Sequence, residues 1–341
     1  MMLHPPAMAS GCILLAVLLD RSIGDPLRWP HPVVVMGWWI TSLRRGAEAW
    51  AQDSPGRLRL SGVGITLGLV GGSGLCGWCL EQLAQGRWMT EQSWLTLTSQ
   101  LLMVIGLASA LAGRSLEQAV QAVLNALASG DEALARQRLQ WIVGRDTSHL
   151  RQDEILRAAA ETAAENAVDG LFAPLFWMLA GLMVWQINAC GPGPLTLAWA
   201  FKAASTLDSM LGYRTGRLQW LGTAGARLDD LLVWPACRLV MLSLPLVSAP
   251  WNRWFQLVRA AEREGRFDPS PNAGRAEAIY AHCAGVRMGG RNRYGDRWVM
   301  KPLLAAAHPA PSTTGVMRIL RFSQRLELAW LIAPLTVLLT G

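Results

Sequence analysis

The chain has 341 residues, of which 52% are hydrophobic and only 16% are charged, and its formal net charge is +7. A soluble domain carries about a quarter charged residues, so this composition indicates an integral membrane protein. The positive charge suits both a positive-inside bias and anionic substrates. No Lys- or Arg-rich polar run alternates with aromatic residues, so we expect no nucleic acid among its partners.

Apolar segments recur along the chain and predict several crossings of a lipid bilayer. The expected membrane segments lie near residues 8–24, 60–80, 92–113, 170–200, 231–250 and 328–340. The fourth is interrupted by Gly191-Pro-Gly-Pro194, which predicts one span followed by a broken or re-entrant segment. The predicted fold class is therefore an all-α integral membrane protein. We expect residues 1–341 to form one polytopic helical bundle with broken or re-entrant segments and helical cytoplasmic loops.

Polar regions between these segments carry the candidate functional motifs. They are residues 114–169, 202–230 and 251–327. The proline-rich stretch Asp20–Pro32 is predicted to be an ordered turn, and residues 44–59 a polar loop. Arginine counts favour a cytoplasmic position for most of the polar regions, and we expect every charged motif to face the cytoplasm.

A row of acidic residues leads directly into the fourth apolar segment. Glu154, Glu161, Glu165 and Asp169 are spaced so that they share one face of an α-helix. Carboxylates at this spacing repel one another unless a cation lies between them. The obvious cation is Mg²⁺ carrying a phosphate. The alternative is a solvated polar face on a helix that precedes a membrane span.

Two further motifs border apolar runs. Lys202 precedes Thr206, Asp208 and Ser209, which offer a point charge for phosphate and small oxygen ligands; the alternative is a helix cap and turn. The second motif is Arg227-Leu-Asp229-Asp230, in which one acid could hold a metal while the other pairs with the arginine. The alternative is that these acids are present because the helix macrodipole favours negative charge at the start of a helix.

The last polar region is rich in glycine and arginine. Ser270–Gly274 and Gly285–Tyr294 predict turns whose exposed backbone N–H groups, with a nearby arginine, suit anions. Lys301 follows them. No Gly-x-x-x-x-Gly-Lys-Ser/Thr motif occurs, which excludes a P-loop nucleotide site. His31, between two prolines, is a candidate acid–base residue or ligand, with a structural role as the alternative.

The order of these motifs along the chain resembles one family. It runs through Asp20-x₃-Gly24-Asp25-Pro26, Pro30-His31-Pro32-Val33, Gly144-Arg145-Asp146-Thr147, Glu161-x₃-Glu165-Asn166-x₂-Asp169-Gly170, Thr206-Leu-Asp208-Ser209-Met210-x-Gly212-Tyr213, Ala226-Arg227-x-Asp229-Asp230, Ser270-Pro-Asn272-Ala-Gly274, Gly289-Gly290-x-Asn292-x-Tyr294 and Lys301-Pro302. This pattern resembles the adenosylcobinamide-phosphate synthases of cobalamin biosynthesis, the CobD/CbiB family of bacterial inner-membrane proteins. The resemblance covers nearly the whole chain.

The resemblance implies an ATP-dependent amide ligation. Such enzymes join adenosylcobyric acid to (R)-1-amino-2-propanol or its O-phosphate, giving adenosylcobinamide or its phosphate. The implied cofactors are ATP and Mg²⁺, the corrinoid is a substrate, and the implied address is the bacterial inner membrane. The lipid bilayer and other enzymes of the cobalamin pathway are the expected partners.

Site roles follow for the matching residues. We expect Glu161, Glu165 and Asp169 to bind Mg²⁺ and nucleotide phosphates, with Asp229 or Asp230 completing the cluster. Asp208 or His31 would take a proton from the attacking amine, and the predicted catalytic set is Glu161, Glu165, Asp208 and His31. The predicted phosphate- and substrate-binding residues are Arg145, Lys202, Arg227, Asn272, Arg287, Asn292 and Lys301.

Three other interpretations of the sequence compete with this one. A non-enzymatic regulatory or sensory membrane paralogue would show eroded acidic motifs, whereas these are intact. A Mg²⁺-dependent membrane prenyl- or phosphotransferase would show paired Asp-rich motifs. A transporter would show more regular long spans and an internal repeat, and the sequence has no such repeat.

Overall fold

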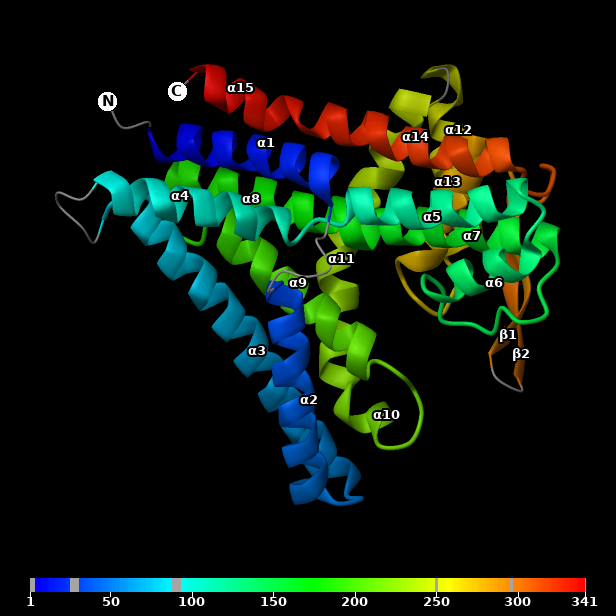
Figure 1. The fold of residues 1–341 in the computed structure, drawn as a ribbon, viewed down its shortest axis with the longest axis horizontal. Helices are drawn as coiled ribbons and strands as arrows, with labels where there is room; N and C mark the ends of the chain where they lie inside the picture. The colour runs from blue at the N-terminus through cyan, green and yellow to red at the C-terminus, as the bar shows by residue number, and fades with distance from the viewer. Residues whose placement is uncertain (1–3, 25–30, 88–92, 249–250, 295–296, 341) are drawn as a thin grey trace. The chain divides into compact units, whose positions relative to one another are not determined.

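The computed structural model describes residues 4–24, 31–87, 93–248, 251–294 and 297–340. Six helical stretches in these ranges are long and apolar enough to cross a membrane. They are Pro5–Ile23, Pro55–Ala84, Trp94–Ala128, Gln152–Ile187, Thr223–Ser248 and Thr313–Thr340. Each overlaps one of the six predicted segments. The chain is therefore a polytopic, almost entirely helical membrane protein, as predicted (Figure 1).

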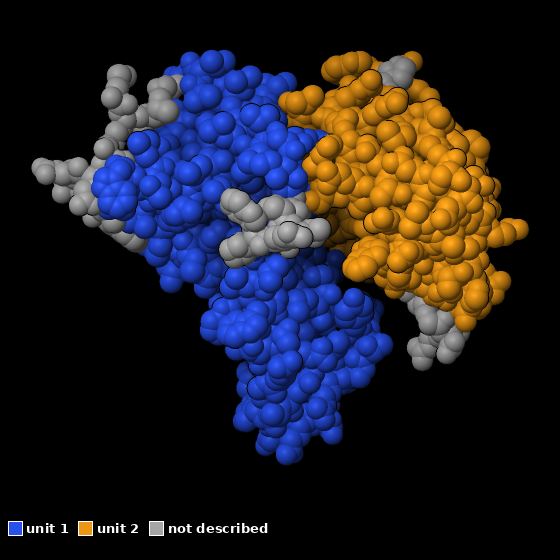
Figure 2. Space-filling model, viewed as in Figure 1, with its two compact units in different colours: residues 1–112, 173–232, 331–341 blue, residues 113–172, 233–330 orange. Residues whose placement is uncertain are grey.

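The chain divides into two compact units, coloured separately in Figure 2. Unit 1 comprises residues 1–112, 173–232 and 331–341, and unit 2 comprises residues 113–172 and 233–330. The helices of unit 1 are α1 (Pro5–Ile23), α2 (Pro32–Ala51), α3 (Pro55–Ala84), α4 (Ser93–Ala108), α8 (Ala173–Ile187), α9 (Pro194–Leu211), α10 (Leu218–Leu221), the first part of α11 (Thr223–Ser248) and α15 (Ile332–Thr340).

Unit 2 contains the remaining elements. They are α5 (Gly113–Ala128), α6 (Glu132–Gln140), α7 (Gln152–Ala167), the π-helical turn η1 (Val168–Phe172), the second part of α11, the 3₁₀ turn η2 (Trp251–Arg253), α12 (Trp254–Gly265), α13 (Ala273–Ala284), β1 (Met288–Tyr294), β2 (Arg297–Leu304) and α14 (Thr313–Trp330). Helix α7 packs against α5, α13 and α14 and also contacts β1. It thus joins elements from both chain ranges of unit 2.

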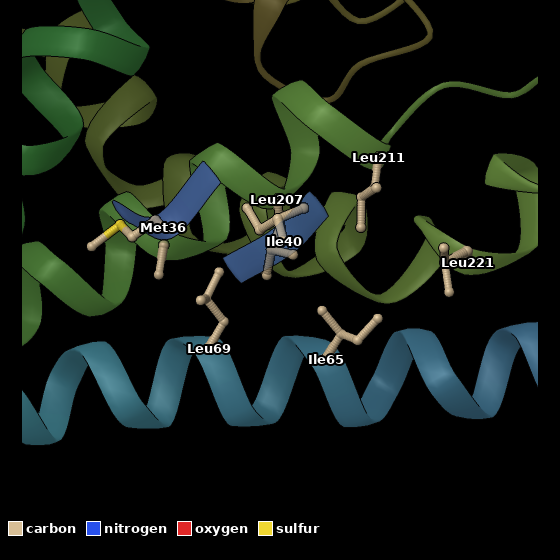
Figure 3. Packing of buried hydrophobic residues seen from close by; sticks show 8 residues of the cluster. Met36, Ile40, Ile65, Leu69, Leu207, Leu211 and Leu221 are labelled. Carbon is tan, nitrogen blue, oxygen red and sulfur yellow. The ribbon is translucent and has the colours of Figure 1, made fainter. Parts of the chain in front are cut away.

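Helices α2 and α3, together with α9, build part of the core of unit 1. Figure 3 shows apolar side chains of α2, α3, α9 and α10 converging between these helices. The cluster consists of Met36, Ile40, Ile65, Leu69, Ala203, Leu207, Leu211 and Leu221. The prediction of a polar loop over residues 44–59 was wrong, because α2 continues to Ala51 and α3 begins at Pro55. Residues 25–30 of the predicted proline-rich turn lie outside the described ranges.

The predicted break in the fourth apolar segment is confirmed. Helix α8 ends at Ile187 and α9 begins at Pro194, after the Gly-Pro-Gly sequence. The N-terminus of α9 is held by the carboxylate of Glu81, a buried residue of α3. Glu81 accepts hydrogen bonds from the backbone N–H groups of Gly193 (3.0 Å), Leu195 (2.7 Å) and Thr196 (3.0 Å), and from the Thr196 hydroxyl. A buried acid here replaces water as the partner of a helix start.

The prediction of glycine-rich turns is confirmed at Gly285, which ends α13 with a left-handed backbone, but it was wrong over residues 288–294. Residues Met288–Tyr294 form β1, which pairs antiparallel with β2 from Gly290 opposite Lys301 to Tyr294 opposite Arg297. A bulge lies between Met288 and Gly290. Glycines at a bulge resemble turn signals in the sequence, because both features require the same backbone freedom.

The Glu81 cap gives a testable prediction about stability. Replacing Glu81 with alanine leaves buried N–H donors of α9 without partners, so we expect the free energy of unfolding to fall by about 3 kcal/mol. Thermal unfolding of the purified protein in detergent, followed by tryptophan fluorescence, measures this loss. The control is Glu48→Ala, which breaks a partly exposed pair with Arg44 (2.8 Å) and should cost less than about 1 kcal/mol. Equal destabilisation by the two variants would contradict the assignment.

Candidate functional site

Glu161 on α7 is a buried carboxylate of unit 2 with three partners. Its Oε2 accepts a hydrogen bond from Arg145 Nη2 at 2.7 Å, and both side chains are 7% exposed. Its Oε1 accepts the backbone N–H of Gly289 at 2.9 Å and lies 3.5 Å from Arg157 Nη1. Arg157 in turn donates to the carbonyl oxygens of Gly289 and Arg291. One carboxylate thereby ties the segment before α7 and the strand β1 to α7.

The backbone at Gly289 is shaped to reach Glu161. Its φ is +82°, and a side chain at this position would overlap the carbonyl oxygen of Pro302 on the paired strand. Any residue with a Cβ would therefore be strained by its conformation and would also push the two strands apart. The N–H that the sequence analysis expected to be exposed for an anion already binds an anion, the Glu161 carboxylate.

A polar pocket of about 220 Å³ lies beside this network in unit 2. Its lining includes the charged residues Arg145, Glu161, Glu165, Glu277 and Lys301. Glu165 lies one helical turn beyond Glu161, and its carboxylate makes no hydrogen bond or ion pair with any described residue. The charges of Lys301, Asp268, Glu161 and Arg145 act on it. Glu165 is thus the one pocket acid among these residues whose oxygens remain available to a ligand.

Lys301 is held in this pocket by two acids that the sequence analysis missed. Its Nζ lies 3.1 Å from Glu277 and 3.3 Å from Asp268, and Glu277 is almost completely buried. Burial raises the pKa of Glu277 to about 8, against the lowering effect of Lys301. Burial opposes the charge of Lys301, but Glu277, Glu165 and Asp268 raise the pKa of its ammonium. Three acids thus lie around one ammonium, and a further cation bound beside them would favour their charged forms.

The predicted row of four acids is only partly formed. Glu154 accepts the backbone N–H of Arg151 at 3.0 Å and so caps the start of α7. Glu161 and Glu165 line the pocket. Asp169 lies in the π-helical turn η1, where the α-helical spacing that defined the row no longer holds, and it does not line the pocket. Its role as a metal ligand stays a prediction.

The other predicted binding residues of unit 2 lie away from the pocket lining. The Asn272 side chain accepts a hydrogen bond from Arg238 at 3.1 Å, which explains an arginine in an apolar segment. Arg287 is exposed. Asn292 on β1 is 3% exposed, and neither atom of its amide has a hydrogen-bond partner within the described ranges. That these three residues bind substrate stays a prediction.

A second charged group lies in unit 1, at the C-terminal end of α9 and the start of α11. The charges of Asp208, Asp230 and Lys202 act on Asp229. Burial, followed by the charge of Asp230, raises the pKa of Asp208. These acids lie within helices, where the sequence analysis offered caps and turns as the alternative. A raised pKa makes an ionised carboxylate a stronger base.

The hydroxyl groups near Asp208 are not free ligands. Thr206 Oγ1 donates to the carbonyl of Lys202 at 2.7 Å, and Ser209 Oγ donates to that of Thr206 at 3.0 Å, so both bond back to α9. His31 caps α2, because its Nδ1 accepts the N–H of Val33 at 3.3 Å. This cap supports the structural alternative for His31, and its catalytic role stays a prediction. Arg227 is exposed on α11.

Neither unit holds a preassembled metal site within its described residues. Among the described residues, no three His, Cys, Asp or Glu side chains are grouped closely enough to hold a metal ion. Mg²⁺ does not need such a group, since proteins commonly bind it through one or two carboxylates plus substrate phosphates. Glu161 and Glu165 belong to unit 2, whereas Asp229 and Asp230 belong to unit 1. That they complete one cluster stays a prediction.

The fold and these residues define a class: a multi-pass helical membrane protein with a buried, acid-rich polar pocket. The family model described as CobD/Cbib protein matches residues 13–323, and the chain belongs to this CobD/CbiB family.

A Synechocystis protein named "Cobalamin biosynthesis protein CobD" is 39% identical over 95% of this chain and 90% of its own. A Yersinia enterocolitica protein of the same name is 40% identical over 84% of this chain and 85% of its own. The Salmonella typhimurium "Cobalamin biosynthesis protein CbiB" is 35% identical over 94% and 95%. No solved structure matches the chain.

The close approach at Gly289 gives a second prediction. Gly289→Ala combines a strained φ with overlap against Pro302, so we expect the free energy of unfolding to fall by about 3 kcal/mol or more. Gly130 is a matched control, because its φ is +79° and nothing lies within 4 Å of the position that a Cβ would take. Gly130→Ala should therefore cost only about 1 kcal/mol. Thermal unfolding of both variants measures the difference, and equal losses would show that overlap at Gly289 is unimportant.

Proposed function

We propose that the chain acts in cobalamin biosynthesis as an ATP-dependent ligase. The reaction would join the propionate carboxylate of adenosylcobyric acid to (R)-1-amino-2-propanol or its O-phosphate through an amide. The observation that carries the proposal is the pocket of unit 2, in which Glu165 has a free carboxylate beside a surplus of fixed acids. The family and the names of its members support the pathway.

The pocket suits a nucleotide phosphate with its cation. Glu165 is the residue best placed to hold Mg²⁺, with Glu161 beside it and Asp169 as the further predicted ligand. Bound Mg²⁺ would supply charge that neutralises the phosphates during transfer. Arg145 lines the same pocket, and its buried Nε has no hydrogen-bond partner within the described ranges. This donor and Lys301 are the groups that would meet phosphate oxygens.

ATP solves a chemical problem that this reaction poses. A carboxylate is a poor electrophile, so its oxygen must first attack a phosphorus atom of ATP to give an acyl phosphate or acyl adenylate. The amine nitrogen then attacks the acyl carbon, the C–N bond forms, and the C–O bond breaks to release phosphate or AMP. The proton lost by the amine needs an acceptor. Asp208 suits this role better than His31, because its carboxylate makes no hydrogen bond or ion pair with any described residue, whereas His31 Nδ1 already accepts the N–H of Val33.

The proposed location is the bacterial inner membrane with the charged motifs facing the cytoplasm. Arginine-rich polar segments favour that side of a membrane. The same side gives the charged pockets access to ATP and to a soluble corrinoid. A membrane address would also place the enzyme beside other enzymes of the pathway.

The direct test is turnover by the purified, detergent-solubilised full-length protein. It is supplied with adenosylcobyric acid, ATP, Mg²⁺ and aminopropanol or its phosphate, and products are identified by mass spectrometry. We expect a product at the mass of the amide that requires both ATP and Mg²⁺. Corrinoid binding without any product from either amine would contradict the proposed reaction.

Substitution of Glu165 tests the site. Glu165→Ala should lower turnover by about 100-fold or more, because the free pocket carboxylate is lost, while the protein still inserts into the membrane. The control is Glu154→Ala on the same helix, which removes a capping acid outside the pocket and should keep turnover within about twofold of wild type. Retained activity in the Glu165 variant would exclude the assignment.

A further inference from the structure

An apolar groove of about 660 Å³ lies in unit 1, along α2 and α3. Helix α2 contributes Val35, Trp39 and Leu43 to its lining, and α3 contributes Gly68 and Gly72. The three side chains of α2 are each more than a third exposed, so the groove is open to the surroundings of the protein. A volume of this size can hold a ligand, since ligand pockets measure about 300–1,000 Å³.

The groove is hollow because glycines line it on α3. A Cβ at Gly68 or Gly72 would meet nothing within 4 Å among the described residues. Gly62 of the same helix differs, because a Cβ there would overlap the carbonyl oxygen of Leu221. A glycine inside a helix costs about 1 kcal/mol relative to alanine. Close packing within the chain explains Gly62, whereas the two groove glycines leave room for a molecule from outside.

The position of the groove along α3 indicates what surrounds it. The lining residues Gly68–Cys76 lie in the interior of the apolar stretch Pro55–Ala84, which is long enough to cross a membrane. On α2 the groove runs from Pro32 to Leu43, a length of about 16 Å at the helical rise of 1.5 Å per residue. This is close to half of the hydrocarbon core of roughly 30 Å, which is the depth of one leaflet. The groove therefore matches a single acyl chain.

The connected ends of α2 and α3 carry residues that are typical of a membrane–water interface. The guanidinium carbon of Arg57 lies 5.7 Å from the centre of the Trp50 ring, and that of Arg59 lies 4.4 Å from the Trp220 ring. Tryptophan is enriched at this interface, and long arginine side chains reach toward the headgroups. Trp50 follows Leu43 by seven residues, so it lies on the groove face of α2.

Positive charge is in excess at these connected ends. Residues 44–59 contain four arginines and two acids. The acids Glu48 and Asp53 are each paired with another arginine at 2.8 Å, and Arg57 makes no ion pair with any described residue. Arg57 precedes Gly68 by eleven residues, which places it on the groove face of α3. An anionic group at the end of the groove would thus meet an unpaired guanidinium.

We propose that this groove binds one acyl chain of an anionic phospholipid, with the phosphate of the headgroup at Arg57. The chain fills the space beside Gly68 and Gly72, where the protein has no side chain of its own. The headgroup lies at the interface that Trp50 and Arg57 mark. This site is separate from the proposed ligase function, because it contains none of the residues assigned to catalysis.

Native mass spectrometry of the full-length protein tests the acyl-chain site. The detergent-solubilised protein is titrated with dioleoyl-phosphatidylglycerol or dioleoyl-phosphatidylcholine, and bound lipids are counted from the mass. We expect one phosphatidylglycerol to bind more tightly than any further lipid. Gly72→Leu should raise its Kd by about tenfold or more, because the new side chain occupies the groove and displaces buried methylene groups. Gly68→Leu should act in the same way, and it replaces the first variant if that one does not fold.

The matched control for these variants is Gly71→Leu. Gly71 is also an exposed glycine of α3 with nothing within 4 Å of its Cβ position among the described residues, but it lies outside the groove lining. This variant should bind the lipid as the wild type does. Unchanged affinity in both groove variants would overturn the proposal, and so would an equal loss in the Gly71 variant.

A second pair of variants tests the headgroup. Arg57→Gln should raise the Kd of phosphatidylglycerol by about fivefold and leave that of phosphatidylcholine unchanged. The control is Arg45→Gln, because Arg45 is exposed, has no partner in the described ranges, and lies on the opposite side of α2 from Leu43. It should change neither Kd. Equal affinity of the wild type for the two lipids would overturn the headgroup assignment.

A second copy of the chain is the competing occupant of the groove, because helices with exposed glycines can pack closely in a membrane. The same spectra report the oligomeric mass. A wild-type monomer that loses its tight lipid in the groove variants supports the lipid site. A wild-type dimer that Gly72→Leu converts to a monomer with unchanged lipid affinity would overturn it.

Discussion

The buried carboxylate of Glu161 is the interaction on which the proposed site depends. It binds the guanidinium of Arg145 and the N–H of Gly289, and it lies beside Arg157, which holds β1 through two carbonyl groups. Removing one member of such a buried ion pair typically costs about 3–5 kcal/mol, because the other charge is left unpaired. The network therefore holds β1, the first strand of the β1–β2 pair, against α7. It also leaves the next acid on that helix, Glu165, as the one whose oxygens are open to a ligand.

A buried carboxylate also organises unit 1, where it has a different role. Glu81 is as deeply buried as Glu161, and it satisfies the backbone N–H groups at the broken start of α9. In a membrane protein an unsatisfied backbone group has no water to bind, so an internal acid makes an interrupted helix possible. The helix that begins after this break carries Lys202 and Asp208 to the charged group at its other end. One buried acid thus positions a catalytic candidate several turns away.

Much of this architecture could be predicted from the sequence, and the failures have a common cause. Apolar length predicted the six spans, and the Gly-Pro-Gly-Pro194 sequence predicted the break, because both are local properties. The order of the motifs predicted the family. Contacts between residues distant in sequence could not be predicted, because they leave no local pattern. Examples are the contacts of Lys301 with Glu277 and Asp268, and the contact of Glu81 with the start of α9. Residues 44–59 resembled a loop because their charged residues masked the end of α2 and the start of α3.

The central claim is that ATP activates the propionate carboxylate for attack by an amine, and oxygen transfer tests this most directly. Adenosylcobyric acid labelled with ¹⁸O in that carboxylate is incubated with the purified protein, ATP, Mg²⁺ and the amine phosphate. If the carboxylate attacks ATP, one labelled oxygen must leave with phosphate or with AMP when the amide forms. We expect ¹⁸O in one of these two products in a one-to-one ratio with amide. Amide formed while phosphate and AMP remain unlabelled would contradict the claim.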